Sequence, residues 1–227
     1  MNVAILVAAG RGARMGRDKL FLEVAGKPVV AHTWARFDAA RSIDEIIVVV
    51  RAGTEKKFAA LAKKYKFRKK FQIVTGGAER QDSVWAGLEA APPDADIVAV
   101  HDAARPCVNN DLIAATVKYA EETGAAVAAH PVTDTIKESA DGRLVQKTLD
   151  RSQLWAMETP QTFRFDVIRR AIAAARAKKL VFTDDTAACE LIGQPVRLVS
   201  SIAPNPKVTL PGDLLFVETL LNNRNGH

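Results

Sequence analysis

A glycine-rich, basic loop directly follows an apolar run near the start of this sequence, an arrangement that can bind a polyphosphate. The apolar run covers residues 3–8, and the loop covers residues 8–19. Its glycines allow backbone amides to approach phosphate oxygens, while Arg14 and Lys19 supply positive charge. The loop is therefore a candidate triphosphate site, with a structural turn and a dinucleotide site as the two alternatives.

Two well-known phosphate-binding patterns fit this loop poorly. A P-loop requires Gly-Lys-Ser/Thr leading into a helix, and that sequence is absent. A dinucleotide fingerprint requires an immediate helix and an acidic residue about 20 positions later, at the end of the second strand. Here the next helix is expected near Pro28, and the second strand ends only at Val50-Arg51. A wide loop around a triphosphate fits this spacing better.

Three further segments place chemically useful side chains directly after expected strands or near the end of the chain. Asp102, beside Arg105, could hold Mg²⁺ that bridges phosphates, or could simply cap a turn. Residues 76–83 could place small residues and Ser83 against a base or ribose, or could form an ordinary turn between strand and helix. Lys207 could reach the same phosphates, although a single lysine usually faces solvent.

Short β-branched runs alternate with amphipathic segments along most of the chain. We expect strands at residues 3–8, 46–50, 71–75, 97–100, 125–130 and 196–199. We expect helices at residues 28–40, 56–70, 80–91, 110–123, 164–178 and 186–192, and a last helix from residue 213. Continuous apolar strands alternating with helices predict an α/β, Rossmann-like fold with a mostly parallel central sheet and helices on both faces. Ligands bind such sheets beyond the carboxyl ends of the strands, where the loops above lie.

Residues 131–151 interrupt this alternation. Two polar, strand-like pieces at residues 132–137 and 144–149 flank Asp141-Gly142, which is a hairpin turn signal. The hairpin is too polar for the core, so we expect a protruding arm that covers a site or embraces another subunit. The whole chain, residues 1–227, is otherwise expected to form a single domain.

Composition excludes several classes of protein. The chain has 48% hydrophobic and 26% charged residues, with no apolar stretch long enough to span a membrane. Cys107 and Cys189 form neither a disulfide framework nor a metal-ligand spacing, so we expect a cytoplasmic protein. Much of the net charge of +6 lies in residues 56–70, a possible nucleic-acid surface. Apolar residues at helical spacing there favour instead a solvated helix face, capped by Thr54, and no nucleic-acid partner.

Together these segments resemble the 2-C-methyl-D-erythritol 4-phosphate cytidylyltransferases over almost the whole chain. The glycine-rich loop alone would indicate only the broader nucleotidyltransferase superfamily. The most specific segments are His101-Asp102-Ala103-Ala104-Arg105-Pro106, Asp134-Thr135-Ile136-Lys137, Asp150-Arg151 followed by Leu154-Trp155, and Thr159-Pro160-Gln161.

The resemblance implies transfer of CMP from CTP to 2-C-methyl-D-erythritol 4-phosphate in non-mevalonate isoprenoid biosynthesis. Asp102 would coordinate Mg²⁺, and the triphosphate would be gripped by Arg14, Lys19 and Lys207. Other CTP-binding residues would be Ala8, Ala9, Gly10, Gly12, Gly76, Gly77, Arg80, Ser83 and Ala103. The residues at or beside the acceptor would be Arg105, Thr135, Arg151, Thr159 and Thr183. The hairpin arm would cross to a second subunit of a homodimer, so that Thr135 and Arg151 act in the neighbour's site.

The sequence departs from the family pattern at two places. Asp18-Lys19-Leu20 stands where Pro-Lys-Gln is usual, which keeps the lysine but puts the stiffness of the loop in doubt. Gly212 stands where an acidic residue is common, which we expect to weaken the start of the last helix slightly.

Three other functions compete with this interpretation. A sister enzyme, such as a ribitol 5-phosphate cytidylyltransferase, would share the loop, the aspartate and the arm. A nicotinamide-dependent reductase would use Gly10 and Gly12, but the spacing between loop and helix is wrong for it. A nucleic-acid-binding module built on residues 56–70 would leave Asp102 and the glycine-rich loop unexplained.

Overall fold

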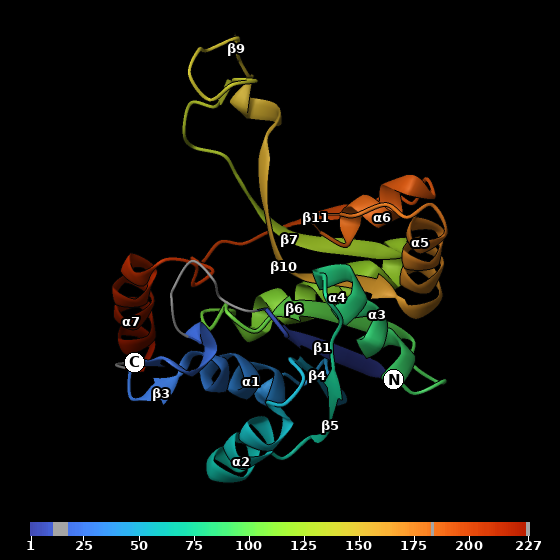
Figure 1. Cartoon of the computed structure of the whole chain (residues 1–227), viewed down its shortest axis with the longest axis vertical. Helices are drawn as coiled ribbons and strands as arrows, with labels where there is room; N and C mark the ends of the chain where they lie inside the picture. Colours follow the sequence, from blue (N-terminus) through green and yellow to red (C-terminus); the bar gives the residue numbers. More distant parts are fainter. Residues whose placement is uncertain (11–17, 183, 226–227) are drawn as a thin grey trace.

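A seven-stranded sheet forms the middle layer of the protein (Figure 1). The computed structural model describes residues 1–10, 18–182 and 184–225. The strands of this sheet are β1 (Asn2–Ala8), β4 (Glu45–Val50), β5 (Lys70–Thr75), β6 (Ile97–Asp102), β7 (Ala125–Pro131), β10 (Trp155–Arg164) and β11 (Arg197–Ser200). Their order is β11-β7-β10-β6-β1-β4-β5, and every neighbouring pair is parallel except the two that involve β10. The predicted mostly parallel α/β sheet is confirmed.

Helices cover both faces of the sheet, as predicted. One face packs against α1 (Val29–Ala39), α2 (Glu55–Tyr65), α4 (Asn110–Thr123) and α7 (Pro211–Asn225), and the other against α3 (Arg80–Ala90), α5 (Phe165–Ala177) and α6 (Thr186–Leu191). Successive residues of β1 alternate between the two cores: Ala4 and Leu6 belong to one, Val3 and Ile5 to the other. Strands buried on both faces need continuous apolar runs, which explains the sequence pattern. None of the helices in the described ranges is long and apolar enough to cross a membrane.

Parallel pairing brings the carboxyl ends of four strands to one edge of the sheet. Val7 lies opposite Asp102, and Ala8 lies opposite Val50. Val50 in turn lies opposite Thr75, the last residue of β5. The loops that follow β1, β4, β5 and β6 therefore meet at this edge, which is where ligands bind in such folds.

Strand β10 was not foreseen, because its sequence contains features that argue against a central strand. Pro160 cannot donate to a ladder, and Glu158 is charged. The strand nevertheless runs antiparallel between β6 and β7, with an irregular register between Met157 and Gln161 and a cis peptide bond before Pro160. The irregularity accommodates the proline, and it places Thr159 beneath the carboxyl end of β6.

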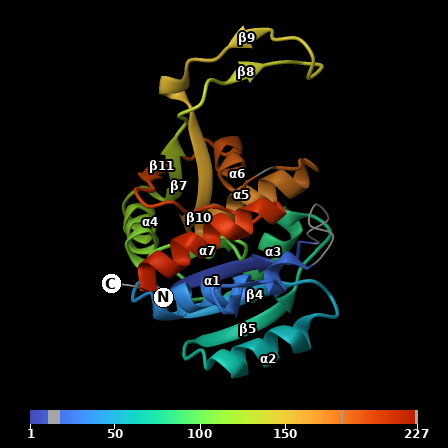
Figure 2. The ribbon, with the colours of Figure 1, turned by 90° about the vertical axis from the view of Figure 1, so that its left-hand side faces the viewer.

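The predicted arm protrudes from the sheet in both views of the molecule (Figures 1 and 2). The two strands predicted within it are wrong in extent, because β8 (Lys137–Glu138) and β9 (Lys147–Thr148) have two residues each. The Asp141 carboxylate accepts backbone hydrogen bonds from Arg143 and Leu144, which closes the tip as a turn rather than as a long ladder. A short 3-10 helix, η3 (Arg151–Gln153), leads from the arm into β10.

The predicted basic helix is confirmed as α2, but it ends at Tyr65, because Lys70 already begins β5. Its start differs from the prediction as well. Thr54 is its N-cap residue, but the hydroxyl donates a hydrogen bond to the Arg51 carbonyl at 2.6 Å instead of capping the helix. The expected capping bond is therefore wrong. Between the described parts of the first loop and α1, the chain also forms a short 3-10 helix, η2 (Lys19–Phe21), and a small hairpin of β2 (Glu23–Val24) and β3 (Lys27–Pro28).

The start of α7 shows how the chain accommodates Gly212. The Asp213 carboxylate accepts hydrogen bonds from the backbone N–H groups of Thr209 and Leu210, at 2.7 and 2.8 Å. These contacts satisfy the N–H groups of the two residues directly before the helix, as the third residue of a helix does in a capping box. The helix begins at Pro211, two residues earlier than expected.

Gly87 of α3 provides a test of how closely this helix packs on the sheet. A Cβ atom there would lie 2.7 Å from the Ile5 Cγ2 atom and 3.1 Å from the Val49 Cγ2 atom. We predict that Gly87→Ala lowers the free energy of unfolding by about 1–3 kcal/mol through overpacking, measured by urea denaturation. The sign is opposite to the gain of about 1 kcal/mol expected from helix propensity alone.

Gly212→Ala is the matched control, because nothing lies within 4 Å of a Cβ atom at that helical position. We expect this variant to be as stable as the wild type or more so. Equal stabilisation by both substitutions would show that α3 does not pack tightly through Gly87.

Candidate active site

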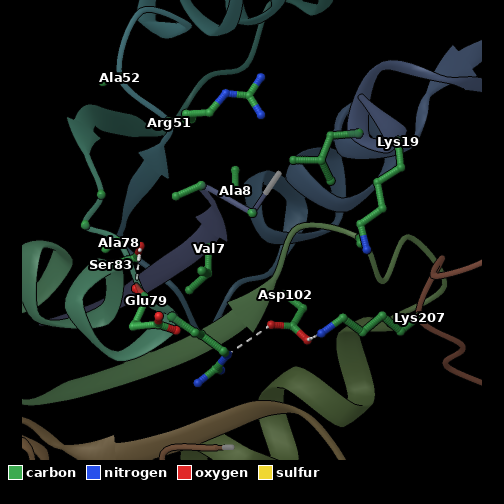
Figure 3. A pocket seen from close by; sticks show the side chains of 17 residues that line it. Val7, Ala8, Lys19, Arg51, Ala52, Ala78, Glu79, Ser83, Asp102 and Lys207 are labelled. Atoms are coloured by element: carbon green, nitrogen blue, oxygen red, sulfur yellow. Dashed lines mark hydrogen bonds and ion pairs between the residues drawn. The ribbon is translucent and has the colours of Figure 1, made fainter. Parts of the chain in front are cut away.

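A cavity of about 440 Å³ opens at the carboxyl edge of the sheet (Figure 3). It gathers ten of the predicted site residues: Ala8, Ala9, Gly10, Lys19, Gly76, Gly77, Arg80, Ser83, Asp102 and Lys207. They come from the ends of β1, β5 and β6, from the start of α3, and from segments near both ends of the chain. The cavity is thus assembled from residues nearly 200 positions apart.

The wall after β5 requires glycine. A Cβ atom on Gly76 would lie 2.6 Å from the Ser83 Oγ atom, 2.7 Å from the Ala9 Cβ atom and 3.0 Å from the Val49 Cγ1 atom. Real Cβ atoms do not approach other heavy atoms below 3.0 Å. The backbone at Gly76 therefore passes between β1 and α3 only because it has no side chain, which brings two loops of the cavity together.

Helix α3 begins at the cavity because its first turn is capped by acidic side chains. Glu79 is the N-cap residue, and it forms a reciprocal capping box with Asp82. This cap fixes Arg80 as the first residue of the helix and Ser83 three residues later, both lining the cavity. The capping box satisfies N–H groups that the helix itself leaves without partners.

Asp102 is the electrostatic centre of the cavity. Its carboxylate lies 2.6 Å from the Lys207 Nζ atom, 3.4 Å from the Arg80 Nε atom and 3.9 Å from the Arg105 Nε atom. Burial alone would raise the pKa of Asp102, but Lys207 and Arg80 outweigh it and lower the pKa below its usual range. The carboxylate is therefore ionised at neutral pH.

His101 and Thr159 fix the backbone of this aspartate from below. The backbone N–H of Asp102 donates to the Thr159 hydroxyl at 3.1 Å, and that hydroxyl lies 3.0 Å from the His101 Nδ1 atom. The His101 Nε2 atom lies 3.2 Å from the Arg105 carbonyl, which can only accept. Nε2 therefore carries the proton, and Thr159 donates to Nδ1. Complete burial lowers the pKa of His101 to about 3, so the ring is neutral.

Arg80 is shared between two carboxylates. Besides Asp102, it contacts Asp185 at 2.8 Å, and Asp185 is almost completely buried at the start of α6. Burial acts to lower the pKa of Arg80, but Asp185 and Asp102 outweigh it and raise the pKa. The ion pair with Asp185 therefore ties the cavity to α6. In the sequence, Asp185 is a single aspartate before a helix and indicates no more than helix capping. Its pairing with Arg80 was therefore not predicted.

The segment 205–208 holds the two lysines of the cavity in place. Asn205 donates from its side chain to the Glu158 carboxylate and the Thr159 carbonyl, at 3.0 and 2.8 Å. Val208 donates its N–H to Ala104 at 2.8 Å and accepts a hydrogen bond from the Lys19 Nζ atom at 2.8 Å. Lys207, between these anchors, points to Asp102. Neither Asn205 nor Glu158 was foreseen, because each is a single polar residue in an unremarkable stretch.

The sequence pattern of the 2-C-methyl-D-erythritol 4-phosphate cytidylyltransferase family matches residues 2–223 of the chain. The chain belongs to this family. It is 43% identical over 226 residues to the enzyme of that name from Pelotomaculum thermopropionicum, covering 98% of this chain and 95% of the relative. It is 44% identical over 225 residues to the one from Clostridium acetobutylicum, covering 97% of each chain.

Two solved structures share the fold of this chain. The crystal structure of 2-C-methyl-D-erythritol 4-phosphate cytidylyltransferase from Thermus thermophilus is 35% identical, with a TM-score of 0.80 over 98% of this chain and 100% of that one. The 4-diphosphocytidyl-2C-methyl-D-erythritol synthase from Anaerococcus prevotii is 28% identical, with a TM-score of 0.87 over 98% of this chain and 96% of that one. The resemblance found in the sequence is thereby confirmed over nearly the full length.

Five predicted residues in the described part of this cytidylyltransferase-family chain lie outside the cavity wall. Ala103 is fully buried, with its carbonyl bonded to Thr33, and its neighbour Ala104 lines the cavity instead. Arg105 and Thr159 lie behind Asp102, within its supporting network. The remaining two, Thr135 and Arg151, are exposed on the arm and at its base. The predicted residues Gly12, Arg14 and Thr183 lie outside the described residues.

The described wall of the cavity offers a donor for a divalent cation that is also bound by substrate phosphates. Among the described residues, no cluster of three or more His, Cys, Asp or Glu side chains is placed to hold a metal ion. Asp102 supplies one ionised carboxylate at the cavity wall. Mg²⁺ is commonly bound by one or two carboxylates, substrate phosphates and water, and this donor set fits that pattern.

Because His101 is buried in its neutral form, it makes the stability of the protein depend on pH. Its pKa is about 3 when folded and about 6.5 when unfolded, so between these values only the unfolded chain binds the proton. We predict that this lowers stability by about 1.4 kcal/mol for each pH unit below about 6.5. Asp102 is ionised in both states above about pH 5, so it does not contribute between pH 5 and pH 6.5.

The measurement is urea denaturation of the wild type and His101→Gln at pH 7 and pH 5. Glutamine keeps one donor and one acceptor but does not titrate. We expect a smaller loss of stability between the two pH values in the variant, whatever its stability at pH 7. Equal losses in both proteins would show that His101 is not held neutral.

Proposed function

We propose that this protein transfers CMP from CTP to 2-C-methyl-D-erythritol 4-phosphate, giving 4-diphosphocytidyl-2-C-methyl-D-erythritol and pyrophosphate in non-mevalonate isoprenoid biosynthesis. The observation that carries the proposal is the convergence of Lys19, Arg80, Lys207 and Asp102 in one cavity, with Arg80 and Lys207 paired to Asp102. Membership of the cytidylyltransferase family supports the choice of nucleotide and acceptor.

The reaction requires charge neutralisation more than proton transfer. A phosphate oxygen of the acceptor attacks the α-phosphorus of CTP; the new P–O bond forms as the bond to the β-phosphate oxygen breaks, and pyrophosphate leaves. The nucleophile is already an anion, so a general base is unnecessary. Lys19 and Lys207 are proposed to neutralise charge on the triphosphate and on the leaving pyrophosphate, together with Arg14. Positioning and electrostatic stabilisation supply most of the catalysis in such reactions.

The nucleoside is proposed to occupy the side of the cavity formed by the segment after β5. Gly76 and Gly77 leave backbone groups accessible there, and Ser83 lies beside them. Residues 8–10, at the end of β1, line the same cavity and are proposed to contact the nucleotide through their backbone. A wall of small residues and main-chain groups suits a flat base, because side chains do not obstruct its approach.

Asp102 is proposed to hold Mg²⁺ together with the phosphates of the nucleotide. A divalent cation held there would neutralise part of the charge on the phosphates. Lys207 now contacts one carboxylate oxygen of Asp102, while Arg80 contacts the other at 3.4 Å. Asp102 thus orients the side chains of Lys207 and Arg80 in the cavity. This is so for either carboxylate oxygen that would bind the metal.

The arm is proposed to complete the site of a second subunit in a homodimer. Thr135 and Arg151 are exposed, and the arm extends away from the sheet in both views (Figures 1 and 2). The exposed fractions of Leu144 and Val145 near its tip are 73% and 64%, which is unusual for large apolar residues. In such a dimer Thr135 and Arg151 bind the acceptor, as does Thr183, with Arg105 beside them. Thr159, predicted to bind the acceptor as well, is buried and hydrogen-bonded to Asp102 and His101, so its proposed role is to support Asp102. The cytoplasm is the proposed compartment, since reducing conditions suit its two buried cysteines.

The test of the function is pyrophosphate release with each of four nucleoside triphosphates and a series of polyol phosphates. We predict turnover with CTP and 2-C-methyl-D-erythritol 4-phosphate, and much less with ribitol 5-phosphate. Faster turnover with ribitol 5-phosphate would assign the protein to the sister activity. The absence of CTP-dependent release with every acceptor would overturn the proposal.

Lys207→Met is the control for the assay, because it removes the ammonium group and keeps an unbranched side chain. Its turnover should fall by about 10²–10³-fold, as on loss of one group that stabilises transition-state charge. Near-normal turnover would mean that Lys207 only supports Asp102.

A mixed dimer tests whether the arm completes the neighbouring site. Arg151→Ala and Lys19→Ala subunits, given different affinity tags, are co-expressed and the mixed dimer is purified. If the site is shared, one of its two sites contains both Lys19 and Arg151, so about half of the wild-type turnover should return. The unmixed variants serve as controls and should remain low. A mixed dimer no more active than the unmixed variants would show that each subunit has a complete site.

A further inference from the structure

Arg51 is a cation of the cavity to which the mechanism above gives no role. Among the described lining residues, the cations are Lys19, Arg51, Arg80 and Lys207, and the carboxylates are Glu79 and Asp102. Arg80 and Lys207 are both paired with Asp102. We propose that Arg51 binds the outer phosphates of the nucleotide, and that Asp18 holds its side chain in position until the nucleotide binds. This inference rests on the proposed binding of CTP.

The position of Arg51 follows from the sheet. It comes directly after β4, whose last residue, Val50, pairs with Ala8 at the end of β1. Its side chain is therefore anchored at the same edge as the glycine-rich loop. Figure 3 shows Arg51 and Lys19 extending from separate elements of the cavity wall. A guanidinium at this place can donate two parallel hydrogen bonds to phosphate oxygens, which a lysine cannot do.

The ion pair between Arg51 and Asp18 is long and partly exposed. The Arg51 Nη2 atom lies 3.4 Å from the Asp18 Oδ2 atom, and the exposed fractions of the two side chains are 38% and 28%. Charge-assisted hydrogen bonds in a close pair measure about 2.7–2.9 Å, and pairs as exposed as this one contribute little. A triphosphate carries more negative charge than one carboxylate, so it can displace Asp18 from the guanidinium.

Asp18 keeps a second cation if Arg51 turns to a phosphate. The Lys57 Nζ atom lies 3.9 Å from the same Asp18 oxygen. That ammonium also lies 3.5 Å from the centre of the Phe21 ring, an attractive position for a cation. Asp18 would therefore remain paired, and the start of η2 would remain anchored after the exchange. Lys56, the exposed neighbour of Lys57 on α2, neither lines the cavity nor pairs with Asp18 in the described structure, so it can serve as a control.

Two roles for Arg51 give opposite expectations for Asp18→Asn. If Arg51 binds phosphate, Asp18 competes with the nucleotide, and its neutralisation should leave CTP affinity unchanged or increase it. If Arg51 only anchors Asp18, removing either partner breaks the same contact, and both variants should bind CTP equally weakly. The sign of the Asp18→Asn effect therefore distinguishes a binding residue from a structural one.

The experiment is calorimetric titration of the full chain with CTP and with CMP, in the presence of Mg²⁺ and without acceptor. For Arg51→Met we expect affinity for CTP to fall by about 10-fold, while affinity for CMP changes by less than about 2-fold, because CMP lacks the outer phosphates. Arg51→Lys should recover part of the loss. Asp18→Asn should bind CTP at least as tightly as the wild type, and Lys56→Met should match the wild type.

Three results would overturn the inference. Unchanged CTP affinity in Arg51→Met would exclude the contact, and equal losses for CTP and CMP would move it to the nucleoside. Weakening by Asp18→Asn to the level of Arg51→Met would assign Arg51 a structural role. Thermal unfolding of each variant verifies that the fold is retained. A wild-type chain that binds no CTP would instead contradict the proposed function, so the two failures are distinguishable.

Discussion

The ion pair between Asp102 and Lys207 is the contact around which the cavity is built. It joins the end of a central strand to a segment near the end of the chain, and Lys19, from the first loop, bonds to the next residue of that segment. A buried carboxylate is costly unless cations and hydrogen bonds compensate it. Lys207, Arg80 and Arg105 supply that compensation together. The same arrangement concentrates positive charge where a triphosphate would bind. The cations that stabilise the Asp102 carboxylate are therefore also in place for the phosphates.

The polar residues beneath Asp102 show how the fold maintains this arrangement. Hydrogen bonds of Thr159 and Asn205 join the irregular part of β10 to the end of β6 and to the segment that carries Lys207. Buried polar groups are tolerated when they are hydrogen-bonded, and a connected network then permits few alternative arrangements. The neutral His101 belongs to this network, where a charged ring would repel Arg105 and Lys207. The positions of Asp102 and Lys207 in the cavity therefore depend on residues that a substrate need not contact.

The first loop and the arm adapt the same fold to particular tasks. At the first loop, Asp18 replaces the usual proline and is paired with Arg51 and Lys57. Those pairs provide one anchor at the start of η2 where a proline would have stiffened the chain. The arm places polar residues and exposed apolar ones far from the subunit's own sheet. Both features alter only loops, which tolerate change because the paired strands carry most of the buried apolar surface.

The sequence by itself determined the alternation of strands and helices. The rule that ligands bind beyond strand ends, taken together with the family resemblance, selected ten residues that line the cavity. Those signals are local: apolar periodicity, glycines, and charges that follow strands. Tertiary structure alone decided that Pro160 lies within a central strand, that Asp185 pairs with Arg80, and that Asn205 supports Lys207. Each depends on a partner 46 or more positions away, or on pairing with neighbouring strands, and no local pattern encodes such partners. The arm's strands were overestimated for a related reason, because alternating polar residues pair over a long ladder only when another surface covers them.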